Sequence, residues 1–305
     1  MEQVNTVQLH DGEIFGILSN GALIDGKHYK GFVVRGMTGY DEDILSDNKM
    51  DELERLNRII VNCVVGFYPV VKIENPEAAG VVEGDLRGFE DDMDMDGEDR
   101  VNVNDLEWSV DGEPIKDKAL IEKLVWHMST VDRLVLLLAI RRASLGDVFT
   151  YRVKCPNCGV EFDVNVDLSE LAVYESAGEG EMVFESEVNG HKVKWHMLTA
   201  VDEAWLKKME KKIDSNKRMT LGLLARLEEI DGYVVDRRKV TLAMRALRGW
   251  TLRERNQLRN LFRKMEGDVE TEIEHTCKSC GFEWKEELDI GRREFFFPLD
   301  GEISG

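Results

Sequence analysis

The sequence predicts an α+β fold, in which a mostly helical N-terminal region precedes two cysteine-bearing β-hairpins that carry a large, mainly helical insertion between them. Three observations predict this class. Apolar residues recur at helical spacing in the first half of the chain, and alternating apolar and polar residues surround two C-x-x-C-G motifs. Helical periodicity then returns between the two motifs, which lie more than a hundred residues apart.

Length and composition limit the classes of protein to which this chain can belong. The chain has 305 residues, a length at which about two domains are expected. Hydrophobic residues make up 43% of it, which is enough for a packed core. Its apolar runs are too short for a membrane span, and its first residues lack the cationic start and apolar middle of a secretory signal. We therefore expect a cytosolic location. The net charge of −20 disfavours a general coat for nucleic acid.

The first part of the chain contains two patterns that predict secondary structure. Residues 1–30 are rich in glycine, with an alternation near residues 13–18 that indicates a strand or two. The apolar spacing from Leu53 to Val64 predicts one amphipathic helix of about five turns, capped by Ser46 or Asp47.

Residues 83–113 form a strongly acidic stretch, with 13 acidic side chains and two arginines. We expect an exposed insertion, because such a segment is too charged to bury. Part of it resembles a calcium-binding loop, although the glycine position of that loop is occupied by Asp99. The candidate calcium ligands are Asp94, Asp96, Glu98, Asn102 and Asp105. The alternative is a solvated acidic loop without calcium.

The second part begins with a helical block over residues 117–145, which Gly146 is expected to end. The period then changes from 3.6 to 2 around the first cysteine pair, and Asn189-Gly190 predicts a hairpin turn. Residues 199–265 return to helix in three or four pieces. The expected divisions are an N-terminal segment 1–30, a helical segment 31–82, the acidic insertion 83–113, core helices 114–150, a cysteine ribbon 151–298 with an inserted hairpin and helical domain 167–268, and a tail 299–305.

Four of the five cysteines form the two motifs, each between alternating strands. Two thiolates two residues apart can both reach one ion when the chain between them turns tightly, and the following glycine accepts the positive φ that this turn needs. Cys155, Cys158, Cys277 and Cys280 therefore predict a tetrahedral, structural Zn²⁺ site in a split zinc ribbon. Two alternatives remain open at this stage. They are a redox dithiol formed by Cys155 and Cys158, and an iron–sulfur cluster on the same four ligands.

No catalytic residues are predicted. The fifth cysteine, Cys63, lies on the apolar side of its helix and is interpreted as a core residue. His275 is interpreted as a strand residue, and the other histidines show no metal-binding or nucleophile spacing.

Two further features concern interaction surfaces. Arg248, Arg255, Arg259 and Arg263 recur near helical spacing and predict a basic face for phosphate or for an acidic protein surface. Near the C-terminus, the three phenylalanines 295–297 are expected to pack into the core of the ribbon or to dock on another subunit, because an exposed FFF would favour aggregation.

The order of these parts resembles a known family. MTGYDEDIL (37–45), LERLNRIIVNCV (53–64), the stretch from Asp132 to Leu168, a basic helical middle, and CKSCGFEW followed by FFFP together resemble the baseplate proteins of T-even-type contractile-tailed phages. The resemblance covers roughly residues 31–68 and 117–298. In it the four cysteines match the ribbon knuckles of the family, and residues 39–43 match an early signature. The acidic insertion departs from the family pattern.

The resemblance implies a non-enzymatic baseplate component, or an assembly factor for the baseplate and its hub. Its partners would be other tail proteins, with no small-molecule substrate and no membrane. Its location would be the host cytoplasm during assembly and the tail baseplate of the virion. The first alternative is a zinc-ribbon adaptor that binds nucleic acid through the basic helices 248–264. The second is a hydrolase or redox enzyme.

Overall fold

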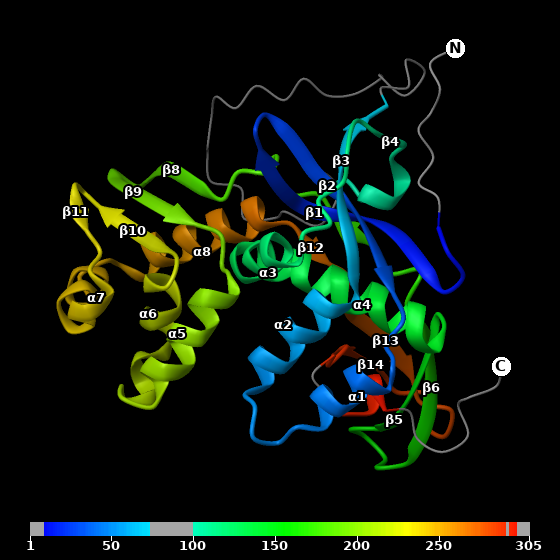
Figure 1. The fold of residues 1–305 in the computed structure, drawn as a ribbon. Coiled ribbons are helices and arrows are strands. Elements are labelled where there is room, and N and C mark those ends of the chain that lie inside the picture. Colours follow the sequence, from blue (N-terminus) through cyan, green and yellow to red (C-terminus); the bar gives the residue numbers. More distant parts are fainter. Residues whose placement is uncertain (1–8, 74–99, 291–292, 298–305) are drawn as a thin grey trace.

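The computed structural model describes residues 9–73, 100–290 and 293–297. Within these residues no helix is long and apolar enough to cross a membrane. Figure 1 shows a central β-sheet with helices below it, a lobe at one side that contains α5 to α8, and the cysteine hairpins near the C-terminus.

The N-terminal region is built around a four-stranded antiparallel sheet in the order β1-β2-β3-β4. Its strands are β1 (Glu13–Ile24), β2 (Lys27–Arg35), β3 (Val64–Lys72) and β4 (Trp108–Val110). Asp25 and Gly26 join β1 to β2 with φ of 49° and 76°, the left-handed pair of a tight hairpin turn. A short 3-10 helix (Val103–Asp105) lies before β4.

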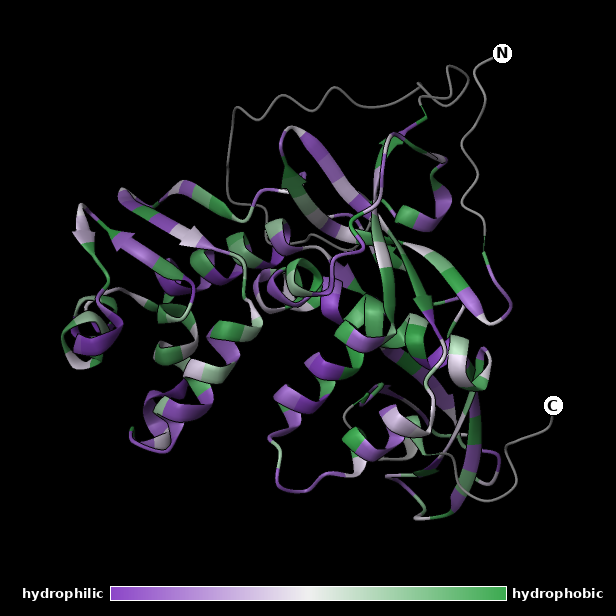
Figure 2. Ribbon diagram, viewed as in Figure 1, coloured by the Kyte–Doolittle hydropathy of each residue, from purple (hydrophilic) through white to green (hydrophobic). Residues whose placement is uncertain are grey.

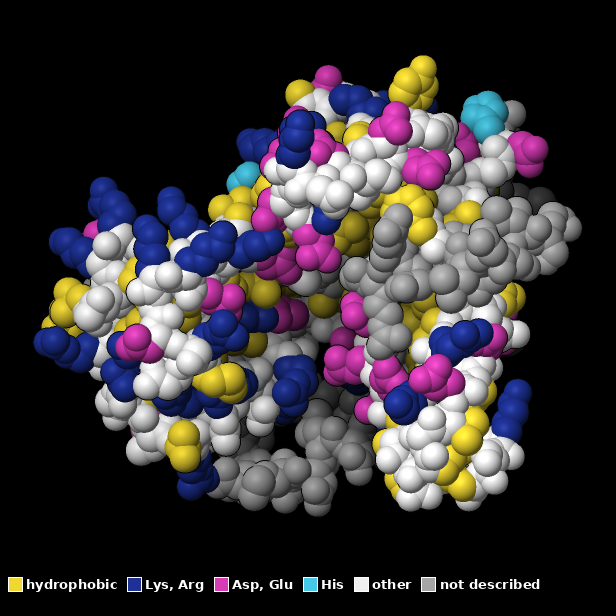
Figure 3. Space-filling model, turned by 90° about the horizontal axis from the view of Figure 1, so that it is seen from below, with side chains coloured by type: hydrophobic (Ala, Val, Ile, Leu, Met, Phe, Trp, Pro, Cys, Tyr) yellow, Lys and Arg dark blue, Asp and Glu magenta, His cyan; other side chains and the backbone are white. Residues whose placement is uncertain are grey.

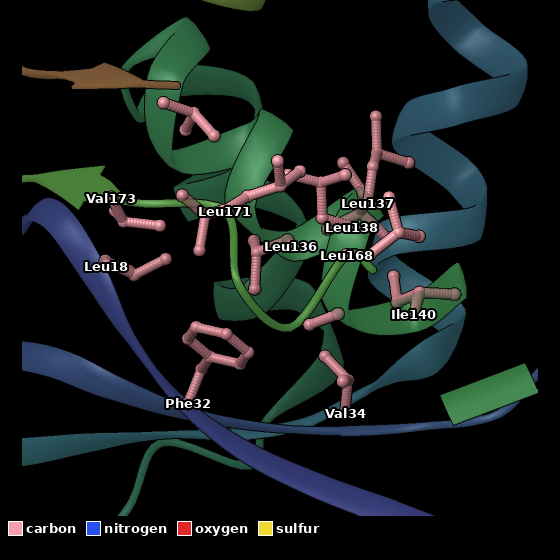
Figure 4. Packing of buried hydrophobic residues seen from close by; sticks show 14 of the residues in the cluster. Leu18, Phe32, Val34, Leu136, Leu137, Leu138, Ile140, Leu168, Leu171 and Val173 are labelled. Atoms are coloured by element: carbon pink, nitrogen blue, oxygen red, sulfur yellow. The ribbon is translucent and has the colours of Figure 1, made fainter. Parts of the chain in front are cut away.

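Four helices pack beside this sheet. They are α1 (Gly39–Ser46), α2 (Glu52–Cys63), α3 (Lys118–His127) and α4 (Thr130–Leu145). In α4 every residue from Val135 to Arg141 is buried, so this helix lies at the centre of the fold. Figure 4 shows Leu136 and its neighbours on α4 facing Phe32 and Val34 of β2. The hydrophobic residues concentrate along α4 and the strands that cover it (Figure 2).

The expectation of a mostly helical N-terminal region is wrong. Residues 27–35 and 64–72 form strands in the middle of the sheet. Lys30 to Val34 are buried without a break, so this strand lacks the period-2 pattern that identifies a half-exposed strand. The predicted long helix is correspondingly shorter: α2 is capped by Asp51, which accepts from the Leu53 backbone N–H, and it ends at Cys63.

The two cysteine hairpins are separate two-stranded sheets. One contains β5 (Val148–Lys154) and β6 (Glu161–Asp167), and the other β13 (Glu272–Thr276) and β14 (Glu283–Glu287). A short pair, β7 (Val173–Tyr174) with β12 (Asp268–Val269), joins the chain where it leaves for the insertion and where it returns. The last described element is α9 (Arg293–Phe296).

The insertion forms a lobe with its own core. Its sheet has the order β11-β10-β9-β8. The strands are β8 (Val183–Val188), β9 (His191–His196), β10 (Leu227–Ile230) and β11 (Tyr233–Val234), and the helices are α5 (Ala200–Glu210), α6 (Arg218–Leu224), α7 (Val240–Arg248) and α8 (Leu252–Glu266), with 3-10 turns at Ser215–Lys217 and Arg237–Lys239. Trp195 is fully buried between the rings of Phe184 and Phe262. The buried residues of the lobe form a cluster separate from the main core.

Asn189 and Gly190 adopt φ of 50° and 86° between β8 and β9, so the predicted hairpin turn is confirmed. The lobe is less purely helical than expected. It contains the predicted hairpin, and β10 and β11 extend that hairpin into a four-stranded sheet.

Candidate metal centre

The two cysteine motifs fold into matching turns. In the first, Cys155 N–H donates to the carbonyl of Val160 and Gly159 N–H donates to the carbonyl of Cys155, both at 2.9 Å. In the second, the same two bonds join Cys277 to Phe282 at 2.8 Å and Gly281 to Cys277 at 2.9 Å. The glycine after each second cysteine has a φ of 74° or 71°, which a residue with a Cβ adopts only at a cost. The glycine therefore explains why each turn can bring its two thiols to one side.

The structure brings all four predicted cysteines together. Their sulfur atoms all lie within 4.8 Å of one another. The Sγ atoms of Cys155 and Cys280 are 3.7 Å apart, and those of Cys158 and Cys277 are 3.6 Å apart. A disulfide needs about 2.05 Å between sulfurs, whereas four thiolates around Zn²⁺ at about 2.3 Å lie about 3.8 Å apart. The separations therefore fit a tetrahedral metal ion.

The protonation of the cluster is uneven. The backbone N–H of Phe282 and the side-chain amide of Asn157 lower the pKa of Cys280 to about 6. The backbone N–H of Val160 favours the thiolate of Cys158, but desolvation and the neighbouring thiols outweigh it and raise the pKa of Cys158 to about 12. Four thiols this close cannot all ionise without a cation between them. A divalent metal supplies that charge, and the N–H donors already present stabilise the sulfurs that bind it.

An aromatic layer joins the two hairpins beside the sulfur cluster. Tyr151 of β5 lies with its hydroxyl 3.2 Å from Nε2 of His275 on β13. Phe162 of β6 packs edge-on against Trp284 of β14, with ring centroids 6.1 Å apart. Burial lowers the pKa of His275, so this side chain is a neutral part of the layer. This agrees with its interpretation as a strand residue.

A redox role for the first pair is not favoured by its setting. A reactive dithiol of the C-x-x-C type places its first cysteine at a helix N-terminus, where the helix dipole stabilises the thiolate. Here Cys155 follows strand β5, and the chain after Cys158 enters strand β6. Cys63 is fully buried, and burial raises the pKa of its thiol to about 12. It is therefore an unreactive core residue, as its helix pattern predicted.

The candidate calcium ligands are only partly described. Asp94, Asp96 and Glu98 lie outside the described residues. Asn102 accepts from the backbone N–H groups of Asn104 and Val173, and so it is already used to hold the chain next to β7. Part of the expected acidic loop is ordered structure, because Val103 is fully buried and Trp108 begins the fourth strand of the sheet.

The C-terminal phenylalanines close the ribbon from the side of the main core. Phe295 is fully buried, and its ring contacts that of Phe149 on β5 at 5.2 Å between centroids. Its carbonyl accepts from Nε of Arg141 on α4 at 2.6 Å. Of the two alternatives for this segment, packing inside the chain is therefore confirmed for Phe295 and Phe296, both of which are buried.

Sequence reasoning missed a buried polar network at the base of the insertion lobe. The carboxylate of Asp132 on α4 accepts from the backbone N–H groups of Asn20 and Gly21 at 2.9 and 3.0 Å. The side chain of Asn20 in turn accepts from Ser176 and donates to the carbonyl of Glu181. Only short polar residues far apart in the chain take part, so no local pattern could reveal it.

The candidate arginines separate into two helices. Arg248 lies at the end of α7, while Arg255, Arg259 and Arg263 lie one turn apart along α8.

A comparison with protein families adds one finding. The family model described as "T4 bacteriophage base plate protein" matches residues 114–297, which is more than half of the chain. The match begins just before α3 and ends after α9, and so it includes both hairpins, all four cysteines and the whole insertion lobe. Residues 31–68, for which the sequence predicted a resemblance to the family, lie outside the match. No curated protein and no solved structure matches the chain significantly.

Proposed function

The chain belongs to the T4 bacteriophage base plate protein family and is a phage baseplate component, and from this premise we propose that it acts without catalysis, through contacts with other tail proteins. The observation that carries the proposal is the extent of the match, which includes the hairpins and the insertion lobe together. The non-enzymatic part is supported by the cysteine site. A metal ion held by four thiolates has no open position for a substrate.

The proposed role of the metal is structural. The two hairpins belong to separate sheets, and the sulfur cluster joins the turn of one hairpin to the turn of the other. We assign Zn²⁺ to the site, because four thiolates in a tetrahedral arrangement are the ligand set that zinc prefers. The hairpins then form a split zinc ribbon, and the insertion lobe is carried between its two halves.

The test of this function is the location of the protein during infection. Mass spectrometry of purified virions, isolated baseplates and tail-assembly intermediates measures whether the chain is present and in what ratio to other tail proteins. We expect it in baseplates, in a fixed ratio. Presence in intermediates alone would assign it as an assembly factor that leaves the particle. Absence from all three fractions would contradict the proposal.

A further inference from the structure

The insertion lobe carries a strongly basic segment, in which Arg237 and Arg238 are paired with Asp202 and Asp236. Residues 237–265 contain ten lysines and arginines and one acidic residue, Glu254. That carboxylate caps α8 by accepting from the Thr251 backbone N–H, and it also accepts from the side chain of Asn189. Figure 3 shows Lys and Arg side chains gathered over the part of the molecule that contains the lobe, while Asp and Glu side chains gather on the other part, across the gap.

Four arginines concentrate this charge on one side of the lobe. Arg255, Arg259 and Arg263 follow one another along α8 at steps of four residues, over about 12 Å of helix. Arg248 of α7 joins them, since its charge and that of Arg259 act with burial to lower the pKa of Arg255. None of the four forms an ion pair with a carboxylate of the part of the chain that the structure describes.

The surroundings of these arginines are typical of a surface that binds another molecule. The guanidinium of Arg255 is anchored through its Nη2, which donates to the hydroxyl of Thr220 at 2.8 Å, while its Nε is buried without a hydrogen-bond partner among the described residues. Leu252, three residues before Arg255 on the same face of α8, is 76% exposed. We call Leu252 and the four arginines the arginine face.

We propose that the arginine face binds a carboxylate-rich surface of a neighbouring tail protein. Protein interfaces are enriched in arginine and in large apolar side chains, and complementary charge steers and orients their assembly. An exposed leucine among the arginines favours a protein over nucleic acid, whose interfaces are more polar and more uniformly basic. The inference rests on the proposed function and names the chemistry of one partner.

The first experiment identifies that partner. A photo-crosslinking amino acid replaces Leu252 in the full chain during infection, and the linked peptide is sequenced. The control carries the same crosslinker at Tyr40 of α1, which is 83% exposed and lies outside the lobe. We expect Leu252 to link to a peptide of another tail protein with an excess of Asp and Glu, and Tyr40 not to link to it. Links to a neutral or basic peptide, to nucleic acid, to a second copy, or to residues 74–99 of the same chain would overturn the proposal.

The second experiment measures the contribution of the charge. The pair Arg248→Gln with Arg259→Gln avoids Arg255, whose bond to Thr220 has a structural role. The matched control, Arg58→Gln with Arg152→Gln, removes the same charge from two exposed ion pairs outside the lobe. We expect the first pair to weaken association with baseplates that lack this protein by about 30-fold, the effect typical of interface hot spots. The control should change it less than about twofold.

Both pairs should keep the unfolding temperature of the unsubstituted chain. Equal association of the two pairs would overturn the proposal. This failure differs from failure of the proposed function, in which even the unsubstituted chain is absent from baseplates and assembly intermediates.

Discussion

Removing the metal should release the second cysteine hairpin before any other part of the molecule. The first hairpin buries four apolar side chains against the main core: Phe149, Tyr151, Val153 and Val166. At about 1.5 to 3 kcal/mol for each buried side chain, these contribute about 6 to 12 kcal/mol before the entropy of ordering the chain is subtracted. In β13 and β14 only His275 is buried. Ile273 and Trp284 are partly buried against the main core. Because this packing is thinner than that of the first hairpin, and a two-stranded hairpin alone is marginal in water, the second hairpin depends more on the metal.

The expected size of this effect follows from the affinity of such sites. Structural zinc contributes on the order of 10 kcal/mol, and even half of that, about 5 kcal/mol, speeds amide exchange by roughly a few thousand-fold. The assay is hydrogen exchange with mass spectrometry on zinc-loaded and chelator-treated protein. We expect peptides from residues 272–287 to lose nearly all protection and those from residues 148–167 to lose less. Residues 183–196 of the lobe should keep theirs, because the lobe has its own buried cluster.

Two results would refute this reasoning. Unchanged protection in residues 272–287 would show that the hairpin is stable without metal. Simultaneous loss of protection in residues 183–196 would show that the lobe has no independent core. Cys63→Ala removes a thiol that is buried in the main core and away from the motifs, and so it should show the same zinc-dependent protection as the unsubstituted chain.

Three further predictions concern single side chains. Burial alone would raise the pKa of Asp202, but hydrogen bonds from His196, Thr199 and Arg237 lower it to about 2. Because the folded pKa of Asp202 is below the ordinary 3.8, its ionised carboxylate stabilises the protein by about 2 kcal/mol above pH 4, and this stabilisation is lost as the pH falls toward 2. The free energies of unfolding of Asp202→Asn and of the unsubstituted protein, measured by urea titration, should therefore converge at low pH. A difference between them that does not change with pH would contradict the argument. Phe295→Ala should cost about 3 to 5 kcal/mol in thermal unfolding because that ring is fully buried, and a cost below about 1 kcal/mol would show that the site collapses around the gap. Cys63 should react with a thiol reagent only after unfolding, since burial raises its pKa to about 12, and rapid labelling of the folded, metal-loaded chain at Cys63 would be inconsistent with its position.

The candidate site could be predicted from the sequence because its signals are local. Each C-x-x-C-G motif specifies its own turn, and the alternating residues on either side specify the strands. The Asn189-Gly190 turn and the helical periodicity of α8 are local in the same way. The motifs do not reveal which distant residues pack around the site, such as Phe295, whose ring contacts Phe149.

The strand predicted near residues 13–18 is confirmed as part of β1, but the other strands of the N-terminal sheet could not be predicted, for a physical reason. The central strand β2 is covered on both faces, so Lys30 to Val34 form a continuous buried run without alternation. Lys30 is a charged residue that suggests an exposed position, but it is buried, paired with Glu175, 145 residues further along the chain, and lies over the ring of Trp108. The fourth strand, at Trp108, is three residues long and lies within a stretch whose charge suggested a loop. Tertiary packing determines these strands, and the local sequence pattern does not reveal that packing.

The most direct test of the metal-held ribbon is the metal content of the purified full chain, measured by elemental mass spectrometry together with the amide protection of residues 272–287. We predict one zinc per chain in the unsubstituted protein, and loss of both zinc and protection in Cys277→Ser. A chain that contains no metal and still protects the second hairpin would contradict the account.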